Sequence, residues 1–232
     1  MVDQISRETL QEKVYNSIKE SIVTNELLPG EVLSIDSLSR ELGVSPTPVR
    51  EALTRLSTQG LVESARNKKA KVAPIEKEDV RQTYEVRKLL EPYACKLAAE
   101  HLEECSGVER ELVDLKVRIE NLQAKVESGE FTDNGYGDYF QVDFRLGEYV
   151  EEILGGTLLG SILKLIGEHS ERLRYFAEES GDDVKEILMD NNREHLSIIN
   201  ALLDRNPDEA KSRVTEHLHH AEERTVTALE VA

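Results

Sequence analysis

The side chains best suited to bind a partner lie in the first third of this chain. Four polar or basic residues share one segment with a helical pattern: Ser45, Thr47, Arg50 and Arg55. A helix fits the major groove of DNA, and an arginine fork can donate two hydrogen bonds to one guanine or phosphate. Arg50 is therefore the expected contact, with an ion pair to Glu51 as the alternative. Arg40, just before this segment, is expected to contact a phosphate or to be solvated.

Four cations crowd into six positions of a polar turn further along the chain: Arg66, Lys68, Lys69 and Lys71. The turn joins two short segments in which apolar residues alternate, and this pattern predicts a β-hairpin. A basic hairpin tip suits the sugar–phosphate backbone or the minor groove of a duplex. We therefore expect double-stranded DNA as the partner, with a solvated run of charges as the alternative.

Five elements must fold together to present these side chains. The sequence predicts an amphipathic helix, two shorter helices and two strands, over 7–25, 35–42, 45–60, 61–65 and 71–74. Ser34 and Ser45 stand at the starts of the two shorter helices as N-caps, and Gly43 and Gly60 stand at their ends, where a left-handed backbone costs little. This order is typical of a winged helix-turn-helix, which we place at residues 1–75.

The pattern beyond residue 76 is helical throughout. Six helices are expected, near 77–104, 108–127, 138–153, 158–179, 184–204 and 207–229. Asn206 followed by Pro207 marks the start of the last one as an N-cap and a first-turn proline. Six helices without a strand pattern predict an all-α antiparallel helical bundle over residues 76–232. The expected fold class is therefore mainly α.

The charge of the chain is divided unequally between these two parts. Residues 1–75 hold 10 basic and 10 acidic residues, so the whole net charge of −17 falls on residues 76–232. The neutral part, with its local clusters of basic residues, can bind the phosphates of DNA, whereas the acidic part repels them. The charge distribution thus restricts DNA to the first part of the chain.

Cysteine content and hydropathy indicate the compartment. Cys95 and Cys105 are too few for a disulfide framework and do not form a CxxC pair. No apolar run reaches the roughly 20 residues that span a bilayer, and the first residues lack the apolar stretch of a signal peptide. We expect a cytoplasmic protein with reduced cysteines and no membrane partner.

Three segments carry a family resemblance. LPGEVLSIDSLSRELGVSPTPVREALTRLSTQGLVE closely resembles the DNA-binding domain of GntR-family transcription regulators. EDVRQTYEVRKLLEPYACKLAA and NREHLSIINALLDRNPDEAKSRVTEHL resemble the first and the last two helices of an FCD-type effector domain, as in the FadR-like subgroup. Relatives often carry an arginine in place of Pro46 and a glycine near Lys69. The operator sequence and the exact shape of the wing therefore cannot be carried over.

The resemblance implies a divalent metal inside the bundle, held by one aspartate and three histidines. Asp143, His195 and His217 stand at three of these positions, and Gly147 stands where the fourth ligand, a histidine, is expected. Oxygen and imidazole ligands of this kind suit Zn, Ni, Mn or Fe. Water, an effector carboxylate or His169 would complete the coordination. Alternatively, the loss of one imidazole abolishes metal binding.

The resemblance also implies an effector pocket. Tyr84, Arg87 and Glu91 are spaced by three and four residues and share one helical face, with Arg87 where relatives have an arginine near the pocket. Arginine binds a carboxylate through paired charge-assisted hydrogen bonds. An Arg87–Glu91 ion pair that supports the helix is the alternative. Arg174 and Asn192 are expected to line the same cavity.

These features predict a homodimeric regulator, most simply a repressor, whose operator affinity is controlled by a small carboxylate or similar metabolite. Two recognition helices related by a two-fold axis would bind half-sites about one helical turn apart. Two alternatives stay open. One is a metal-dependent enzyme with an iron-type site at Asp143, His195 and His217, although no nucleophile motif such as GxSxG is present. The other is a regulator with a structural metal, or none, and no effector.

Overall fold

The computed structural model describes residues 9–63, 70–130, 145–179 and 184–231 of the chain. The chain divides into two compact units, Met1–Ile75 and Glu76–Ala232. None of the helices in the described ranges combines the length and the apolar character that a membrane span requires. Each unit is described separately below.

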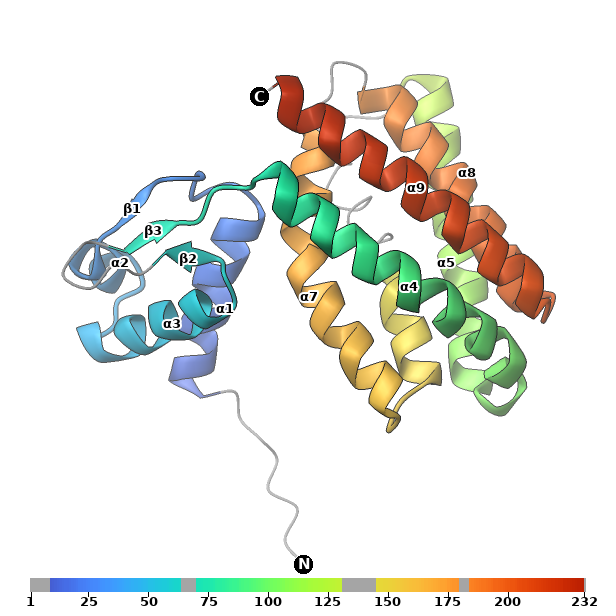
Figure 1. Cartoon of the computed structure of the whole chain (residues 1–232), viewed down its shortest axis with the longest axis horizontal. Coiled ribbons are helices and arrows are strands. Elements are labelled where there is room, and N and C mark those ends of the chain that lie inside the picture. The colour runs from blue at the N-terminus through green and yellow to red at the C-terminus, as the bar shows by residue number, and fades with distance from the viewer. Residues whose placement is uncertain (1–8, 64–69, 131–144, 180–183, 232) are drawn as a thin grey trace, which may run out of the picture. The chain divides into compact units, whose positions relative to one another are not determined.

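The described residues of the first unit form three helices and a small sheet (Figure 1). In chain order these are α1 (Leu10–Val23), β1 (Val32–Leu33), α2 (Ile35–Glu41), α3 (Pro46–Thr58), β2 (Val62–Glu63) and β3 (Ala70–Val72). The sheet is antiparallel with the order β1-β3-β2, and β3 pairs Lys71 with Val32 and Val72 with Val62. The winged helix-turn-helix expected from the sequence is thus confirmed, with β1 as an additional short strand.

Side-chain caps set where the helices of this unit begin. The hydroxyl of Thr9 accepts a hydrogen bond from the backbone N–H of Glu12 at 3.2 Å, so α1 begins at Leu10 rather than at residue 7. Ser34 caps α2 as predicted and accepts from the N–H of Ser37 at 3.4 Å. Ser45 is the N-cap residue of α3 by position, but its side chain makes no capping hydrogen bond.

The different roles of Ser34 and Ser45 give a matched pair of variants. We expect Ser34→Ala to lower the free energy of unfolding by about 1 kcal/mol, because an N–H of the first turn of α2 loses its acceptor. Ser45→Ala removes no such bond, so its effect on stability should be clearly smaller. Urea denaturation followed by circular dichroism measures both. Equal losses in the two variants would contradict the assignment of the caps.

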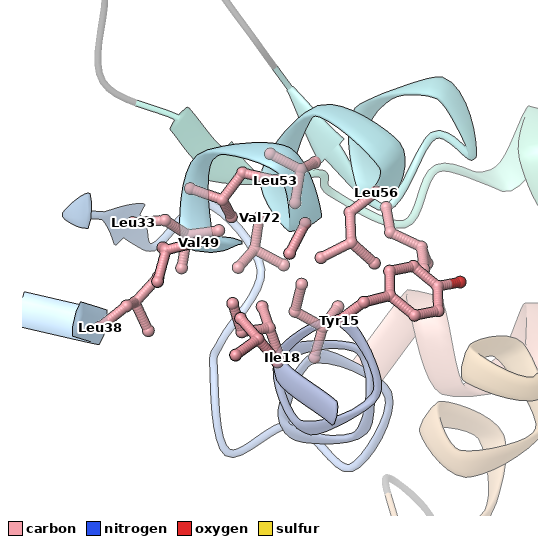
Figure 2. Packing of buried hydrophobic residues seen from close by; sticks show 13 residues of the cluster. Tyr15, Ile18, Leu33, Leu38, Val49, Leu53, Leu56 and Val72 are labelled. Carbon is pink, nitrogen blue, oxygen red and sulfur yellow. The ribbon is translucent and has the colours of Figure 1, made fainter. Parts of the chain in front are cut away.

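The core of the first unit lies between α1, α3 and the sheet (Figure 2). Its labelled members are Tyr15, Ile18, Leu33, Leu38, Val49, Leu53, Leu56 and Val72. Val49 and Leu56 of α3 are completely buried, and the burial of one such side chain contributes roughly 1.5–3 kcal/mol. Helix α3 is therefore held firmly by one face, and its opposite face lies at the surface.

The second unit is helical in all its described elements (Figure 1). It contains α4 (Lys77–His101), the 3₁₀ turn η1 (Leu102–Glu104), α5 (Ser106–Ser128), α7 (Leu158–Glu179), α8 (Val184–Leu203) and α9 (Pro207–Val231). Residues 145–153 are helical as well, and the first part of the helix expected over 138–153 lies outside the described residues. The predicted helical bundle is confirmed.

Helices α4 and α9 lie side by side and run antiparallel (Figure 1). Lys77 at the start of α4 binds Glu230 near the end of α9 at 2.6 Å, and Lys96 near the end of α4 binds Asp208 at the start of α9 at 2.7 Å. Exposed ion pairs of this kind contribute little to stability, because water screens their charges. These pairs therefore mark the register of the two helices more than they stabilise them.

Candidate functional site

The exposed face of α3 carries the predicted DNA contacts. Ser45, Thr47 and Arg50 are all exposed. Within the described part of the chain Arg50 makes no ion pair, and Glu51, its alternative partner, accepts a hydrogen bond from the amide of Gln11 at 2.8 Å. The guanidinium of Arg50 is therefore available to a base or a phosphate.

Arg55 has a different environment on the same helix. Its Nη1 donates to both carboxylate oxygens of Glu12 at 3.0 Å, and its guanidinium lies 3.7 Å from the centre of the Tyr15 ring. The Tyr15 hydroxyl in turn donates to the side-chain oxygen of Gln59 at 2.8 Å. These contacts connect α1 to α3. They give Arg55 a role in orienting α3, and its expected DNA contact stays a prediction.

The remaining cations of the DNA-binding set are only partly described. Arg40 is exposed on α2, and its Nε donates to the backbone oxygen of Asp36 at 3.1 Å. Lys71 is exposed on β3. The other three basic residues of the predicted hairpin tip, Arg66, Lys68 and Lys69, lie outside the described residues. Lys71 thus places one cation of the predicted wing at the surface of the sheet.

A cavity of about 70 Å³ lies inside the second unit, between α4, the helix at 145–153, α7, α8 and α9. Its charged and imidazole side chains are Arg87, Glu91, Glu151, Arg174, His195 and His217. By the same measure one water molecule needs roughly 10–15 Å³, so the cavity has room for a small metabolite. Four of the residues predicted to bind a metal or an effector therefore meet around one cavity.

Arg87 satisfies both interpretations that the sequence left open. It lines the cavity and is only 2% exposed. It also forms the predicted ion pair on its own helix, since Nε donates to Glu91 at 2.7 Å and Nη2 donates to the second oxygen of the same carboxylate at 3.3 Å. Cation and anion thus reach the cavity wall as a pair whose charges cancel.

His195 and His217 lie close together, and their arrangement can be compared with that of metal-binding histidines. The ring centres of His195 and His217 are 4.8 Å apart, a separation at which two imidazoles can bind one ion. Nδ1 of His217 lies 2.7 Å from a carboxylate oxygen of Glu194, so a metal would bind this ring through Nε2. A carboxylate behind a histidine is the usual second contact of metal-binding histidines. The pair therefore fits a metal.

The rest of the implied ligand set is less complete. Asp143 lies outside the described residues, and Gly147 lines the cavity without a side chain. Among the residues that the structure describes, no group of three His, Cys, Asp or Glu side chains is arranged to hold a metal ion. The described part of the site thus supplies two imidazoles for a metal.

Glu194 is the centre of a charged network behind these histidines. Its carboxylate also contacts Nδ1 of His220 at 2.7 Å and accepts from both terminal nitrogens of Arg224, at 3.2 and 3.1 Å. Burial raises the pKa of Glu194, but the hydrogen bonds from His217 and Arg224 outweigh it and hold this pKa well below its usual range. Glu194 is therefore a stable anion that fixes the orientation of His217.

Two predicted effector residues do not line the cavity. Tyr84 is 1% exposed, and its hydroxyl is 3.1 Å from that of Thr225, so it connects α4 to α9. Asn192 is completely buried on α8, and its amide makes no hydrogen bond with any residue of the described ranges. Both side chains are therefore buried in the second unit away from the residues that line the cavity.

Sequence reasoning missed two other lining residues, Cys95 and Glu151. Burial and then the charge of Glu91 raise the pKa of the Cys95 thiol, so the sulfur faces the cavity as a neutral group. Glu151 adds an acidic side chain to the same wall. Neither belongs to a motif, and only the packing of α4 and the helix at 145–153 around one space identifies them.

Comparison with known proteins supports a first unit that binds DNA and a second unit that carries the cavity. Residues 10–72 match the family described as bacterial regulatory proteins of the gntR family, and residues 82–220, more than half of the chain, match the FCD domain. The first match contains the exposed face of α3, and the second contains the cavity. The matched families consist of transcription regulators, so the alternative of a metal-dependent enzyme is set aside.

Individual relatives agree with the family. The transcriptional regulator LutR of Bacillus subtilis is 30% identical over 87% of this chain and 94% of its own length. The transcriptional repressor RspR of Escherichia coli is 25% identical over 92% of this chain and 88% of its own length. The solved structure of E. coli McbR/YncC shares the fold, with a TM-score of 0.75, 21% identity and coverage of 94% of this chain and 98% of that one. The chain therefore belongs to the gntR family of bacterial regulatory proteins, in the group with an FCD domain, and is a DNA-binding regulator of transcription.

Proposed function

We propose that this regulator is a homodimeric repressor in the cytoplasm whose operator affinity falls when a small carboxylate-bearing metabolite binds the FCD domain. The observation that carries the proposal is the cavity in which Arg87, Arg174, His195 and His217 meet. Arginine and imidazole groups in a partly desolvated space favour a ligand with a carboxylate. The name of RspR, a repressor 25% identical to this chain, supports the direction of regulation.

A second copy of the chain is part of the proposal because one α3 presents few side chains to DNA. Ser45, Thr47 and Arg50 occupy only the N-cap and the first turns of α3. Two copies related by a two-fold axis would bind half-sites about one turn of DNA apart and would so double the number of base contacts. Sedimentation of the purified chain would give the oligomeric state, and a monomer that still binds the operator tightly would contradict this part.

The proposed control requires that the effector bind the DNA-free state more tightly than the DNA-bound state. Each tenfold change in operator affinity needs a difference of ~1.4 kcal/mol between these two affinities. The ligand, through Arg87 on α4 and Arg174 on α7, would contact two helices at once. A ligand that joins helices can favour one packing of the bundle over another, and this preference is the required difference.

The proposal extends to a divalent metal held by His195, His217 and Asp143. When bound, such an ion would supply positive charge for an effector carboxylate. This chain's own residues would position it, with Glu194 orienting His217. Elemental analysis of the unmodified protein and of His195→Ala, both dialysed against zinc and then against metal-free buffer, tests this part. Less than 0.1 equivalent of bound zinc in the unmodified protein would contradict it.

The experiment that tests the main proposal begins by selecting an operator from a random-sequence duplex library. Fluorescence anisotropy at fixed salt then gives the affinity with and without a panel of small carboxylates. We expect sequence-selective binding that weakens at least tenfold with one or more of them. Selective binding that no metabolite changes would favour the alternative of a regulator without an effector. Binding without sequence preference would overturn the assignment of α3.

A further inference from the structure

Several large apolar side chains are exposed on two helices of the second unit. Leu89 and Leu158 are 75% and 78% exposed, and Val86, Tyr93 and Leu165 are exposed as well. The first helix, α4, carries Val86, Leu89 and Tyr93, and α7 carries Leu158 and Leu165. Single exposed apolar residues are normal at a protein surface, whereas a contiguous apolar patch marks a contact with another molecule. What matters is therefore whether the five side chains lie together.

The two helices bring these side chains together. α4 and α7 contact each other and run in roughly opposite directions (Figure 1). Burial lowers the pKa of Arg172 on α7 to about 10, and the charge of Asp79 on α4 opposes this shift, so these two residues lie near each other. Val86 follows Asp79 by seven residues, and Leu165 precedes Arg172 by seven residues. Because seven residues make about two turns of a helix, Val86 and Leu165 are also level with each other. Another such step reaches the last apolar residue of the patch on each helix. The patch is called the α4–α7 face below and consists of Val86, Leu89, Tyr93, Leu158 and Leu165.

The charge of the α4–α7 face is unlike that of the rest of its unit. Residues 86–93 and 158–165 hold three basic residues and one acidic residue, whereas residues 76–232 as a whole carry a net charge of −17. Three of these four charges are already in ion pairs within the unit. Two such acidic units repel each other over most of their surfaces. The α4–α7 face is therefore a place where a second copy of the chain can approach without bringing two excesses of acid together.

The area of the α4–α7 face suits a contact between two copies. Taking ~150–200 Å² for a fully exposed side chain of this size, its five residues expose roughly 500 Å². A stable interface buries about 800 Å² on each partner, with an apolar centre that often contains aromatic residues and with a polar rim. Arg81 and Glu85, an exposed ion pair of 3.7 Å on α4, lie next to Val86 and supply such a rim. The face thus offers the greater part of the area that one copy must bury.

The position of the face in the chain connects pairing to DNA binding. Only four residues, 73–76, separate β3 from α4. Two copies joined through α4 would therefore hold two copies of α3 in one particle, as binding to two half-sites requires. We propose that the α4–α7 face is the surface through which a second copy of this chain binds, about a two-fold axis. Such a contact uses the same surface on both copies. The inference rests on the proposed homodimer and names its interface.

Glutamate variants of the face test the proposal on the full chain. In Leu89→Glu a negative charge replaces an apolar side chain between Val86 and Tyr93, and a two-fold dimer would bury this charge twice without a partner. We expect the dissociation constant of the dimer, measured by sedimentation equilibrium, to rise at least 100-fold. Leu165→Glu makes the same change on α7 and should have a similar effect. Operator affinity should fall with both variants.

Val117→Glu is the matched control, since Val117 is an exposed apolar residue of α5, outside the face. It adds the same charge to the same unit, so the dissociation constant should change less than threefold. Circular dichroism checks that each variant folds. If the variants of the face do not fold, hydroxyl-radical footprinting of the unmodified chain decides. Oxidation of Leu89 and Tyr93 should then fall severalfold when the dimer forms, and that of Val117 should stay the same.

The outcomes separate this inference from the proposed function. A dimer that is as stable in Leu89→Glu and Leu165→Glu as in the unmodified chain would overturn the interface and leave the homodimer intact. An equal loss in Val117→Glu would overturn it too, because any added negative charge would then suffice. If the unmodified chain is a monomer at all concentrations, both the interface and the homodimer fall. Monomeric variants that bind the operator as tightly as the unmodified chain would support the interface and contradict a dimer as the DNA-binding form.

Discussion

Replacing Arg50 with alanine is expected to weaken binding to the selected operator about 10- to 100-fold. Arg50 lies in the first turns of α3, on the exposed face opposite Val49 and Leu53, and makes no ion pair within the described part of the chain. A bidentate contact of arginine with guanine contributes ~1–3 kcal/mol of discrimination between bases. Anisotropy titrations with operator and with scrambled DNA, at the same salt concentration, measure the loss.

The choice of replacement shows what Arg50 contacts. Arg50→Lys keeps the positive charge but loses the planar fork, so a base contact predicts a large loss on operator and a small one on scrambled DNA. A phosphate contact predicts similar, small losses on both. Arg193→Ala removes an exposed arginine of α8 and serves as the control. A change of less than twofold in Arg50→Ala would remove Arg50 from the interface.

The boundaries of the helices were predicted from local residues such as caps, prolines and glycines. The accuracy of each predicted boundary depended on how specific those residues are. Proline and asparagine fixed the start of α9, where the side chain of Asn206 accepts from the N–H of Glu209 at 3.2 Å. Gly43 has φ of 65°, as expected for the residue that follows α2. β1 was missed because two residues, Val32 and Leu33, are too short to show alternation. Only pairing with β3 makes them a strand.

Residues that act through distant partners were the hardest to predict. Spacing along α3 placed Arg55 among the DNA contacts, but its carboxylate partner, Glu12, is 43 positions away on α1. No local pattern reports such a pair. Glu151 was missed for a related reason, since its place on the cavity wall results from the packing of its helix near Gly167 of another helix. His195 and His217, in contrast, were found from family positions, and the structure brings their rings together.

The orientation of His217 depends on Glu194, and removal of this carboxylate gives the largest expected loss of stability. We expect Glu194→Ala to lower the free energy of unfolding by about 3 kcal/mol, because the side chain is only 15% exposed and its partner Arg224 only 18%. Loss of one member of a buried ion pair leaves the other charge desolvated without a counter-charge, at a cost of ~3–5 kcal/mol. Partial access to water places this case at the lower end. Urea denaturation at neutral pH measures the change.

Glu216 on α9 provides the matched control for Glu194. Its carboxylate also binds an arginine, Arg213 at 3.2 Å, but the two side chains are 54% and 43% exposed. Glu216→Ala should therefore lower the free energy of unfolding far less than Glu194→Ala does, because water screens this exposed pair. If both variants lose the same small free energy of unfolding, water reaches the network around Glu194 and the carboxylate does not hold His217 in place. A large loss in Glu194→Ala alone means that the histidine facing the cavity is positioned by a buried anion, and ligand binding there would then depend on α8 and α9 remaining packed together.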